Sequence, residues 1–383
     1  MQHNESNESE SSADLHHVVM IKSNLIDIDS RLTKEYYSLK KLHYAVSLLC
    51  WNREGKEEIS DDYSPIEALN IRSPYGIKSL FLLPIWALYS FIKLLLMKYD
   101  IIHVINFDSY IPSLIAAKIR GKPIIYEIED TYEDQILMPN FIREIVLGID
   151  RHLSKFADAI ILVDECQLRE FGDIPNSNVH IIYDSPPDFA QTFTELNSDD
   201  GIFKILYPGV FFRARKLNID KIIEFVLKHD NIQLTLCGYG DMKDELIQLA
   251  NERPDKIRYL GWIPSRVTVF QLLHDSDLTF AFKDTSIPLN RYICGSKIFE
   301  AMMCSVPIIV NANTSVSMKV RKNNCGIVIN VKNESEVESA LLKLIGDRQY
   351  CRSLGENGRR AYSELYRWDI MEDELYAIYK KLL

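Results

Sequence analysis

Residues 295–310 read GSKIFEAMMCSVPIIV, a pattern typical of a short helix that runs through a turn into a strand. Ile298, Ala301 and Met302 recur at helical spacing and would face a core. Pro307 ends the turn, and the residues after it are apolar on both faces, as a central parallel strand requires. The stretch therefore predicts a helix packed against a parallel sheet.

The polar residues of this helix indicate a ligand site. Gly295 or Ser296 is expected to cap the helix start, where free backbone N–H groups attract anions. Lys297, Glu300 and Cys304 fall on another face, so a cation and a carboxylate project together. Such a pair can hold a phosphorylated sugar, with the amides and Lys at phosphates and Glu at hydroxyls. Taken alone, the spacing more often means a solvated ion pair.

Composition limits the class of protein. The 383 residues suggest about two domains, and 47% hydrophobic with 26% charged residues provides material for two cores. A net charge of −10 argues against nucleic acid as the main partner. Residues 1–190 carry net −11 and residues 191–383 net +1, so the second half is the better place to bind an anion.

The cysteines and the N-terminus point to a cytoplasmic protein. Seven cysteines without a CxxC pair fit reduced, buried thiols better than disulfides or a zinc site. Residues 1–14 are rich in Asn, Glu and Ser and contain no apolar segment. We expect a disordered tail there rather than a signal peptide.

Apolar runs that alternate with helical patterns predict two α/β domains. Strands are expected at 17–21, 44–49, 101–105, 124–128, 159–163 and 179–183, and again at 203–207, 232–236, 257–260, 278–281 and 308–310. Strands separated by helices form βαβ units and parallel sheets. The predicted fold is therefore two Rossmann-like, doubly wound domains facing a cleft, at 15–190 and 203–365, joined by a linker at 191–202.

The apolar run at 79–97, SLFLLPIWALYSFIKLLLM, contains Pro84 and Lys93, which leave too short an uncharged piece to span a bilayer. A core helix of the first domain is the favoured interpretation. The alternative is an interfacial helix, with its aromatic and Leu side chains in lipid and its flanking Lys residues at headgroups.

A second candidate site opens the second domain. The strand that begins near residue 203 runs into Gly209, a loop carries Arg213, Arg215 and Lys216, and a helix starts near Asn218. Glycine at a strand end lets a ligand approach the backbone, and cations before a helix N-terminus suit a diphosphate. Such loops are common on surfaces, but this one gains weight when paired with the helix described first.

Together these motifs resemble the donor half of a GT-B glycosyltransferase close to family 4. The family pattern has Gly before Arg or Lys, then Ser-Lys-x-x-Glu followed by small-x-Pro-Val-Ile. Here these read Gly209 with Arg215-Lys216, then 296–300 and 305–309. Residues 236–241 (LCGYGD) and 259–264 (YLGWIP) resemble the family's G-x-G turn and the loop near the nucleotide base. The similarity covers most of residues 203–383.

The resemblance implies roles for these residues. Glu300 would bind the donor ribose, and Arg215 and Lys216, assisted by Lys297, would take the diphosphate and stabilise the departing nucleotide. These cations would replace a metal, so no metal or cofactor is expected. The family's earlier Glu falls at Tyr292. The remaining implied donor-binding residues are Gly209, Gly238, Trp262, Ile263 and Ser296.

The first domain resembles the family more loosely. Glu129 stands where relatives often have His, and Asp130 follows it at the end of the strand at 124–128. A carboxylate there could act as a general base for the acceptor hydroxyl, which implies inversion, although the family resemblance favours retention. Both residues could equally cap the next helix. The resemblance also implies that a C-terminal helix at 366–383 packs back toward the first domain.

The sequence thus predicts a glycosyltransferase that moves a sugar from a nucleotide-sugar donor, with UDP favoured by family frequency, to a hydroxyl acceptor. The acceptor would be a glycan or a lipid-linked molecule of surface polysaccharide or glycolipid biosynthesis. It would be reached in the cytoplasm or at the inner face of the membrane, through peripheral contact of 79–97. Two alternatives stay open: a GT-B-type nucleotide-sugar epimerase, and a degenerate, non-catalytic partner protein.

Overall fold

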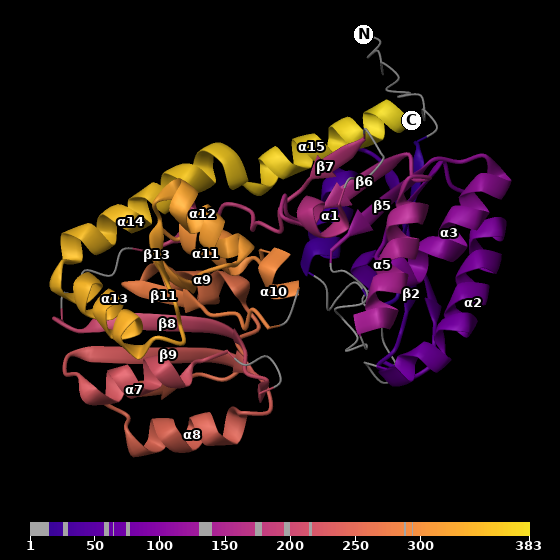
Figure 1. Ribbon diagram of the computed structural model, residues 1–383. Coiled ribbons are helices and arrows are strands. Elements are labelled where there is room, and N and C mark those ends of the chain that lie inside the picture. Colours follow the sequence, from indigo (N-terminus) through magenta and orange to yellow (C-terminus); the bar gives the residue numbers. More distant parts are fainter. Residues whose placement is uncertain are drawn as a thin grey trace, which may run out of the picture. The chain divides into compact units, whose positions relative to one another are not determined.

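The computed structural model describes residues 15–25, 30–56, 61–63, 65–73, 77–129, 140–172, 178–194, 200–213, 217–286, 289–292 and 294–383. The chain forms two compact units (Figure 1). Unit 1 comprises Met1–Ile161, Ile174–His180 and Leu375–Leu383, and unit 2 comprises Leu162–Asp173 and Ile181–Glu374. The last helix thus ends in unit 1, in line with the predicted fold class. The limits of the predicted linker stay predictions.

Unit 1 is built on a seven-stranded sheet in the order β3-β2-β1-β4-β5-β6-β7. The first five strands of this order are paired in parallel throughout. Its strands are β1 (His17–Lys22), β2 (Ala45–Trp51), β3 (Ile66–Leu69), β4 (Ile101–Ile105), β5 (Ile124–Ile128), β6 (Ala159–Leu162) and β7 (Val179–Ile181). Its helices are α1 (Ser30–Lys41), α2 (Leu83–Leu96), α3 (Phe107–Arg120) and α5 (Asn140–Ser154), with short 3-10 turns η2 (Asp61–Tyr63) and η3 (Ile77–Phe81).

Unit 2 contains a six-stranded sheet in the order β10-β9-β8-β11-β12-β13, again parallel. Its strands are β8 (Phe203–Val210), β9 (Ile232–Tyr239), β10 (Ile257–Tyr259), β11 (Leu278–Ala281), β12 (Ile308–Asn311) and β13 (Gly326–Ile329). Its helices are α6 (Gln167–Phe171), η4 (Ala190–Thr192), α7 (Asp220–Lys228), α8 (Lys243–Glu252), α9 (Arg266–His274), α10 (Leu289–Tyr292), α11 (Lys297–Met303), α12 (Ser315–Asn323), α13 (Glu334–Gly346), α14 (Arg348–Ala361), the π-helical η6 (Tyr362–Tyr366) and the start of α15 (Trp368–Leu382).

Most predicted elements are present, with definite differences. Strands β3 and β13 were not predicted, because Glu67 in the first and Gly326 in the second interrupt short apolar runs. Helix α3 begins at Phe107, directly after the short turn that follows β4. All seven cysteines are buried and free, as expected for reduced thiols.

The apolar run at 79–97 forms the end of η3 and the whole of α2. Only Trp86, Ser90 and Leu94 of α2 are buried, so one stripe of the helix faces the core and most of it does not. In the described residues, no helix has the length and apolar character needed to cross a membrane.

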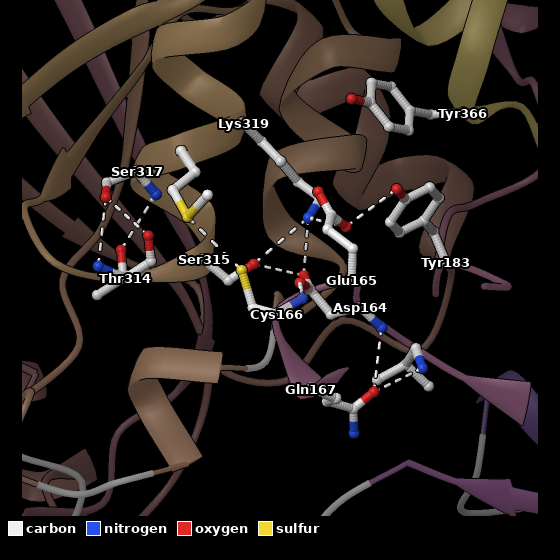
Figure 2. A network of polar contacts seen from close by, with 12 residues as sticks. Asp164, Glu165, Cys166, Gln167, Tyr183, Thr314, Ser315, Ser317, Lys319 and Tyr366 are labelled. Atoms are coloured by element: carbon white, nitrogen blue, oxygen red, sulfur yellow. Dashed lines mark hydrogen bonds and ion pairs between the residues drawn. The ribbon is translucent and has the colours of Figure 1, made fainter. Parts of the chain in front are cut away.

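A buried lysine connects distant parts of the sequence within unit 2 (Figure 2). Lys319 of α12 donates to Asp164 at 2.8 Å and to Glu165 at 2.9 Å, and these two carboxylates follow β6 after one intervening residue, Val163. The Tyr183 hydroxyl donates to Glu165 at 3.0 Å, and the Cys166 amide donates to Asp164 at 2.7 Å. Burial alone would lower the pKa of Lys319, but the neighbouring carboxylates raise it above its ordinary value.

A second buried network joins the end of α15 to the core of unit 1. The His103 ring bonds Glu127 at 2.9 Å through Nε2 and the Tyr379 hydroxyl at 2.8 Å through Nδ1. Arg31 pairs with Glu127 and, at 3.1 Å, with Glu35. His103 therefore has a structural role, because both of its ring nitrogens are bonded inside the core.

The pKa values of Glu35 and Glu127 are shifted in opposite directions, because the two carboxylates share one cation, Arg31. Burial favours the neutral form of both, but Arg31 and the His103 hydrogen bond hold the pKa of Glu127 well below its usual range. Burial, and then the charge of Glu127, raise the pKa of Glu35 well above 4.5. Glu35 is accordingly the protonated member of the pair.

Replacing Glu35 by Gln should change how stability depends on pH. A raised folded pKa contributes stability below the unfolded pKa near 4.5, and this contribution is lost as pH rises through the folded pKa. The stability of Glu35→Gln relative to wild type should therefore increase with pH above 4.5, by up to about 1.4 kcal/mol per unit. Urea unfolding from pH 5 to 9 measures this. Glu252→Gln, an exposed control, should give a flat difference, and a flat difference for Glu35→Gln would contradict the assignment.

Candidate functional site

The predicted cation and carboxylate of α11 lie beside the ends of β8 and α9, and each has a partner other than its helix neighbour. Lys297 Nζ donates to the Pro208 carbonyl and lies 4.6 Å from the centroid of the Tyr207 ring. Glu300 is only 8% exposed and accepts a hydrogen bond from Arg266 Nη2 at 2.9 Å. The simple alternative of a solvated Lys297–Glu300 pair is therefore wrong: the carboxylate is buried and neutralised by another helix.

The predicted cap of α11 is also wrong in its mechanism. Ser296 occupies the N-cap position, but its side chain makes no capping hydrogen bond. Its φ of −59° and ψ of −25° are helical, whereas a capping side chain needs an extended backbone at that residue. Cys304, expected on the polar face, is buried in the core.

Two predicted glycines allow β8 and β9 to approach closely at the site. Gly209 is paired with Gly238 across the two strands. A Cβ on Gly209 would collide with the Lys297 ammonium, and a Cβ on Gly238 would collide with the Gly209 carbonyl. Gly238 has a φ of +142° and donates its N–H to the Gly261 carbonyl at 2.7 Å. Backbone packing therefore restricts position 238 to glycine, whereas a side chain at position 209 would require the flexible end of Lys297 to move.

Exposed aromatic side chains line the same ends of β8, β9 and β10. Trp262 is 65% exposed and meets Tyr239 edge-on, with 5.3 Å between ring centroids. Tyr239 in turn meets Phe212 at 6.0 Å. Ile263, predicted with Trp262, is half-buried and packs against the core beside α11. The sequence identified Trp262 but not the two rings that continue from it.

The cationic loop after β8 is only partly described. Arg215 and Lys216 lie outside the described residues. Arg213 pairs with Glu245 and donates its amide to Asp241 at 2.9 Å. A pocket of about 680 Å³ opens next to it at the ends of β8, β11, β12 and β13.

Polar groups fix the pocket wall. The Asn311 side chain accepts the Lys283 amide at 2.7 Å and donates to the Lys283 carbonyl at 2.8 Å. The lining carries charges of both signs, with Lys283 and Lys332 accompanied by Asp220 and Asp284. Tyr292, which stands at the position of the family's other Glu, ends α10.

In unit 1 the strand ends carry paired charges. Lys22, the last residue of β1, pairs with Glu129, which directly follows β5. The Glu129 amide donates to the Asn106 side chain at 3.0 Å. Asp130 lies outside the described residues, and the next helix that they contain, α5, begins at Asn140, so the predicted capping role of Glu129 and Asp130 stays a prediction.

Next to this pair, Asp108 accepts from the Ser23 hydroxyl and lies 3.4 Å from Arg53. Burial raises the pKa of Asp108, although Ser23 and Arg53 oppose this change. Asp108 is therefore part of a neutralised cluster rather than an exposed acid.

One group in the described residues has the spacing of metal ligands, namely Glu35, His103 and Glu127. Its atoms do not suit a cation. Arg31 already places a positive charge on both carboxylates, and both ring nitrogens of His103 are bonded. We assign no metal to it.

Family models match both parts of the chain. The model described as Glycosyltransferase Family 4 matches residues 37–184, and the model described as Glycosyl transferases group 1 matches residues 188–361. The protein is a GT-B glycosyltransferase of the family 4 type. The resemblance predicted from the motifs of its second half is thus confirmed.

Individual relatives of this glycosyltransferase are distant. N-acetyl-alpha-D-glucosaminyl L-malate synthase of Bacillus anthracis is 24% identical over 257 residues, which is 62% of this chain and 65% of the relative. The match thus spans just under two thirds of that protein. Sucrose-phosphate synthase of Thermosynechococcus elongatus has a TM-score of 0.72 at 17% identity, over 96% of this chain and 99% of that one. HepE of Anabaena, solved with UDP-glucose, has a TM-score of 0.70 at 15% identity, over 96% and 100%. These structures show the fold alone.

Sequence reasoning missed three cations of this glycosyltransferase. Arg266, Lys22 and Lys283 stand beside Glu300, Glu129 and the pocket. A buried carboxylate needs a counter-charge, which was the available signal. The sequence could not say which cation supplies it, because each pair joins separate elements.

Gly238→Ala should be strongly destabilising because its Cβ would meet the rigid Gly209 carbonyl. We expect a loss of about 3 kcal/mol or more in the free energy of unfolding. Gly261→Ala is the matched control, with a positive φ of +65° but open space around the new Cβ. It should cost about 1 kcal/mol. Equal losses, measured by urea unfolding, would show that close packing does not restrict position 238.

The Arg266–Glu300 pair should show coupling in a double-mutant cycle. Removing Arg266 leaves Glu300 buried without its counter-charge, although screening by solvent limits the effect because Arg266 is 47% exposed. For Arg266→Gln, Glu300→Gln and the double variant we expect a coupling of about 1 kcal/mol in unfolding free energy. The exposed Arg253–Asp255 pair, at 3.5 Å, is the control and should show a clearly smaller coupling. Additive losses at Arg266 and Glu300 would contradict the interaction.

Proposed function

We propose that this glycosyltransferase moves a sugar from a nucleotide-sugar donor, bound by unit 2, to a hydroxyl group of its acceptor. The observation that carries the proposal is the buried Glu300 carboxylate, held by Arg266 next to the Lys297 ammonium. A buried, positioned acceptor of hydrogen bonds beside a cation suits a ribose attached to a diphosphate. UDP is the favoured nucleotide, and the complex of HepE with UDP-glucose supports that choice.

The proposed roles divide the donor into three parts. Glu300 accepts hydrogen bonds from the ribose hydroxyls. Lys297, Arg215 and Lys216 neutralise the diphosphate and stabilise the departing nucleotide, so that no metal is required. The base lies near Trp262, where an exposed ring offers a stacking surface. Ile263, Ser296, Gly209 and Gly238 complete the donor-binding set.

For the acceptor side we retain Glu129 and Asp130. Glu129 is ion-paired with Lys22, which stabilises its carboxylate form. A stabilised carboxylate is a weaker base, so the pairing favours retention over direct deprotonation of the acceptor by Glu129. The acceptor itself is proposed to be a glycan or a lipid-linked molecule of surface polysaccharide or glycolipid synthesis, reached from the cytoplasm at the inner face of the membrane.

Donor binding can be tested by thermal shift with UDP, GDP and a panel of their sugar derivatives, with a chelator present. Ligand at 100 times its Kd stabilises the folded state by about 2.7 kcal/mol, which raises Tm measurably. We expect a shift with UDP and with at least one UDP-sugar. Glu300→Gln should weaken the affinity for the nucleotide about tenfold, as expected for the loss of one charged hydrogen bond, and should therefore reduce the thermal shift. Glu252→Gln should leave it intact, and absence of a shift with every nucleotide would overturn the proposal.

Product analysis then separates the remaining alternatives. Transfer releases UDP in proportion to glycosylated acceptor, whereas an epimerase converts the donor sugar without acceptor. A non-catalytic partner protein binds the donor and releases nothing. Loss of transfer on adding the chelator would contradict the assignment of diphosphate neutralisation to side chains alone.

A further inference from the structure

Helix α2 presents a continuous apolar stripe to solvent. Phe81 just before it, and then Ile85, Leu88, Ile92 and Leu96, follow one another at helical spacing and are all exposed, Leu96 by 76%. The opposite stripe of the helix faces the core, so the exposed stripe points away from the sheet. Scattered exposed Leu or Ile residues are ordinary, but a full-length stripe is not.

The same pattern continues on the neighbouring helices. On α3, Ile111, Ile115 and Ile119 are exposed, the last by 64%. On α5, Phe141, Ile145 and Ile149 are exposed at similar spacing. Each set recurs every three or four residues, so each occupies one face of its helix.

Hydrogen bonds between these helices place them in one layer. The Trp86 ring N–H of α2 donates to the Ser109 hydroxyl of α3 at 3.2 Å, and Figure 1 draws α2 and α3 as neighbours. The Tyr110 hydroxyl of α3 donates to the Leu153 carbonyl of α5 at 2.9 Å. Right-handed crossovers from β3 to β4, β4 to β5 and β5 to β6 put all three helices on the same face of the sheet. Their exposed stripes therefore form one surface, the apolar face of unit 1.

The charge around this face differs from that of the whole chain. Residues 77–122 carry six Lys or Arg and two Asp, although the chain has a net charge of −10. Both Asp residues are neutralised, because Asp108 is buried beside Arg53 and Asp100 pairs with Lys122 at 3.0 Å. Two further cations also have carboxylate partners, since Lys93 lies 2.6 Å from Glu67 and Lys118 lies 3.9 Å from Asp158. Among the described side chains of this segment, the surplus positive charge is therefore carried by Lys98 and Arg120, and Lys98 is exposed at the end of α2.

We propose that the apolar face of unit 1 docks on an anionic lipid surface. Apolar stripes enter the boundary between headgroups and acyl chains, and the lysines at the helix ends meet the anionic headgroups. A second copy of the chain fits less well, because it would bring two cationic borders together. The proposal extends the membrane contact of 79–97 to three helices and does not depend on the donor or on transfer.

The test is co-sedimentation of the full chain with lipid vesicles in the absence of any nucleotide sugar. Vesicles of phosphatidylcholine alone are compared with vesicles that also contain phosphatidylglycerol. We expect binding to the anionic vesicles that weakens as salt is raised. The double variant Leu88→Glu with Ile119→Glu should lose binding at least tenfold. Leu342→Glu, which changes a 45% exposed leucine of unit 2, should bind like wild type.

The lysines give an independent readout. Lys98→Gln and Lys118→Gln should each weaken binding to anionic vesicles by about fivefold and leave binding to phosphatidylcholine unchanged. Failure to bind anionic vesicles would overturn the proposal, and so would equal binding by wild type and the Leu88 and Ile119 variant. A dimer seen by light scattering that this variant abolishes, without vesicle binding, would identify the face as a self-association surface instead. None of these results affects the donor-binding test, because no nucleotide is present.

Discussion

The buried ammonium of Lys319 is the interaction on which the order of unit 2 depends. Its partner Asp164 comes from a segment 155 residues earlier and also accepts from the Ser315 hydroxyl. The hydroxyl of Thr314, the residue before Ser315, donates to the Asn311 carbonyl at 3.0 Å. The Asn311 side chain in turn accepts a hydrogen bond from the backbone amide of Lys283 at the pocket wall. A buried ion pair adds little net stability because of its desolvation cost, but few other conformations of the chain would keep both charges paired. Through Ser315, Thr314 and Asn311 the pair is connected by hydrogen bonds to the backbone that lines the pocket.

The two units treat charge at their strand ends differently. In unit 1 the described carboxylates are neutralised locally, as Lys22 with Glu129 and Arg31 with Glu127 show. In unit 2 the Lys297 ammonium meets a backbone carbonyl and an aromatic ring, neither of which cancels its charge. Excess positive charge thus remains where a diphosphate would be stabilised. The net charges of the two halves of the sequence point the same way.

The sequence was sufficient to predict a feature when all the residues that define it lie in one helix or strand. The apolar strand after Pro307 was predicted correctly, and the family pattern pointed to Lys297 and Glu300, whose role in donor binding stays a prediction. It failed where the role of a residue depends on a partner in another helix or strand. A serine before a helix resembles a cap, yet Ser296 has helical backbone angles. Arg266 resembles any exposed arginine until Glu300 packs beside it. The spacing of residues indicates which side chains share a face of a helix, but it does not indicate which residues pair between distant parts of the sequence.

The Glu129 position illustrates why a missing family residue need not mean lost function. Relatives often place a His there, a group that can be neutral, whereas an isolated carboxylate would add a negative charge to the edge of the sheet. Lys22 cancels that charge, and the Asn106 side chain holds the Glu129 backbone in place. The substitution is thus compensated by a cation on a different strand. A largely buried carboxylate needs such a counter-charge in any folded chain, so the Lys22–Glu129 pair explains how this position accepts Glu where relatives have His.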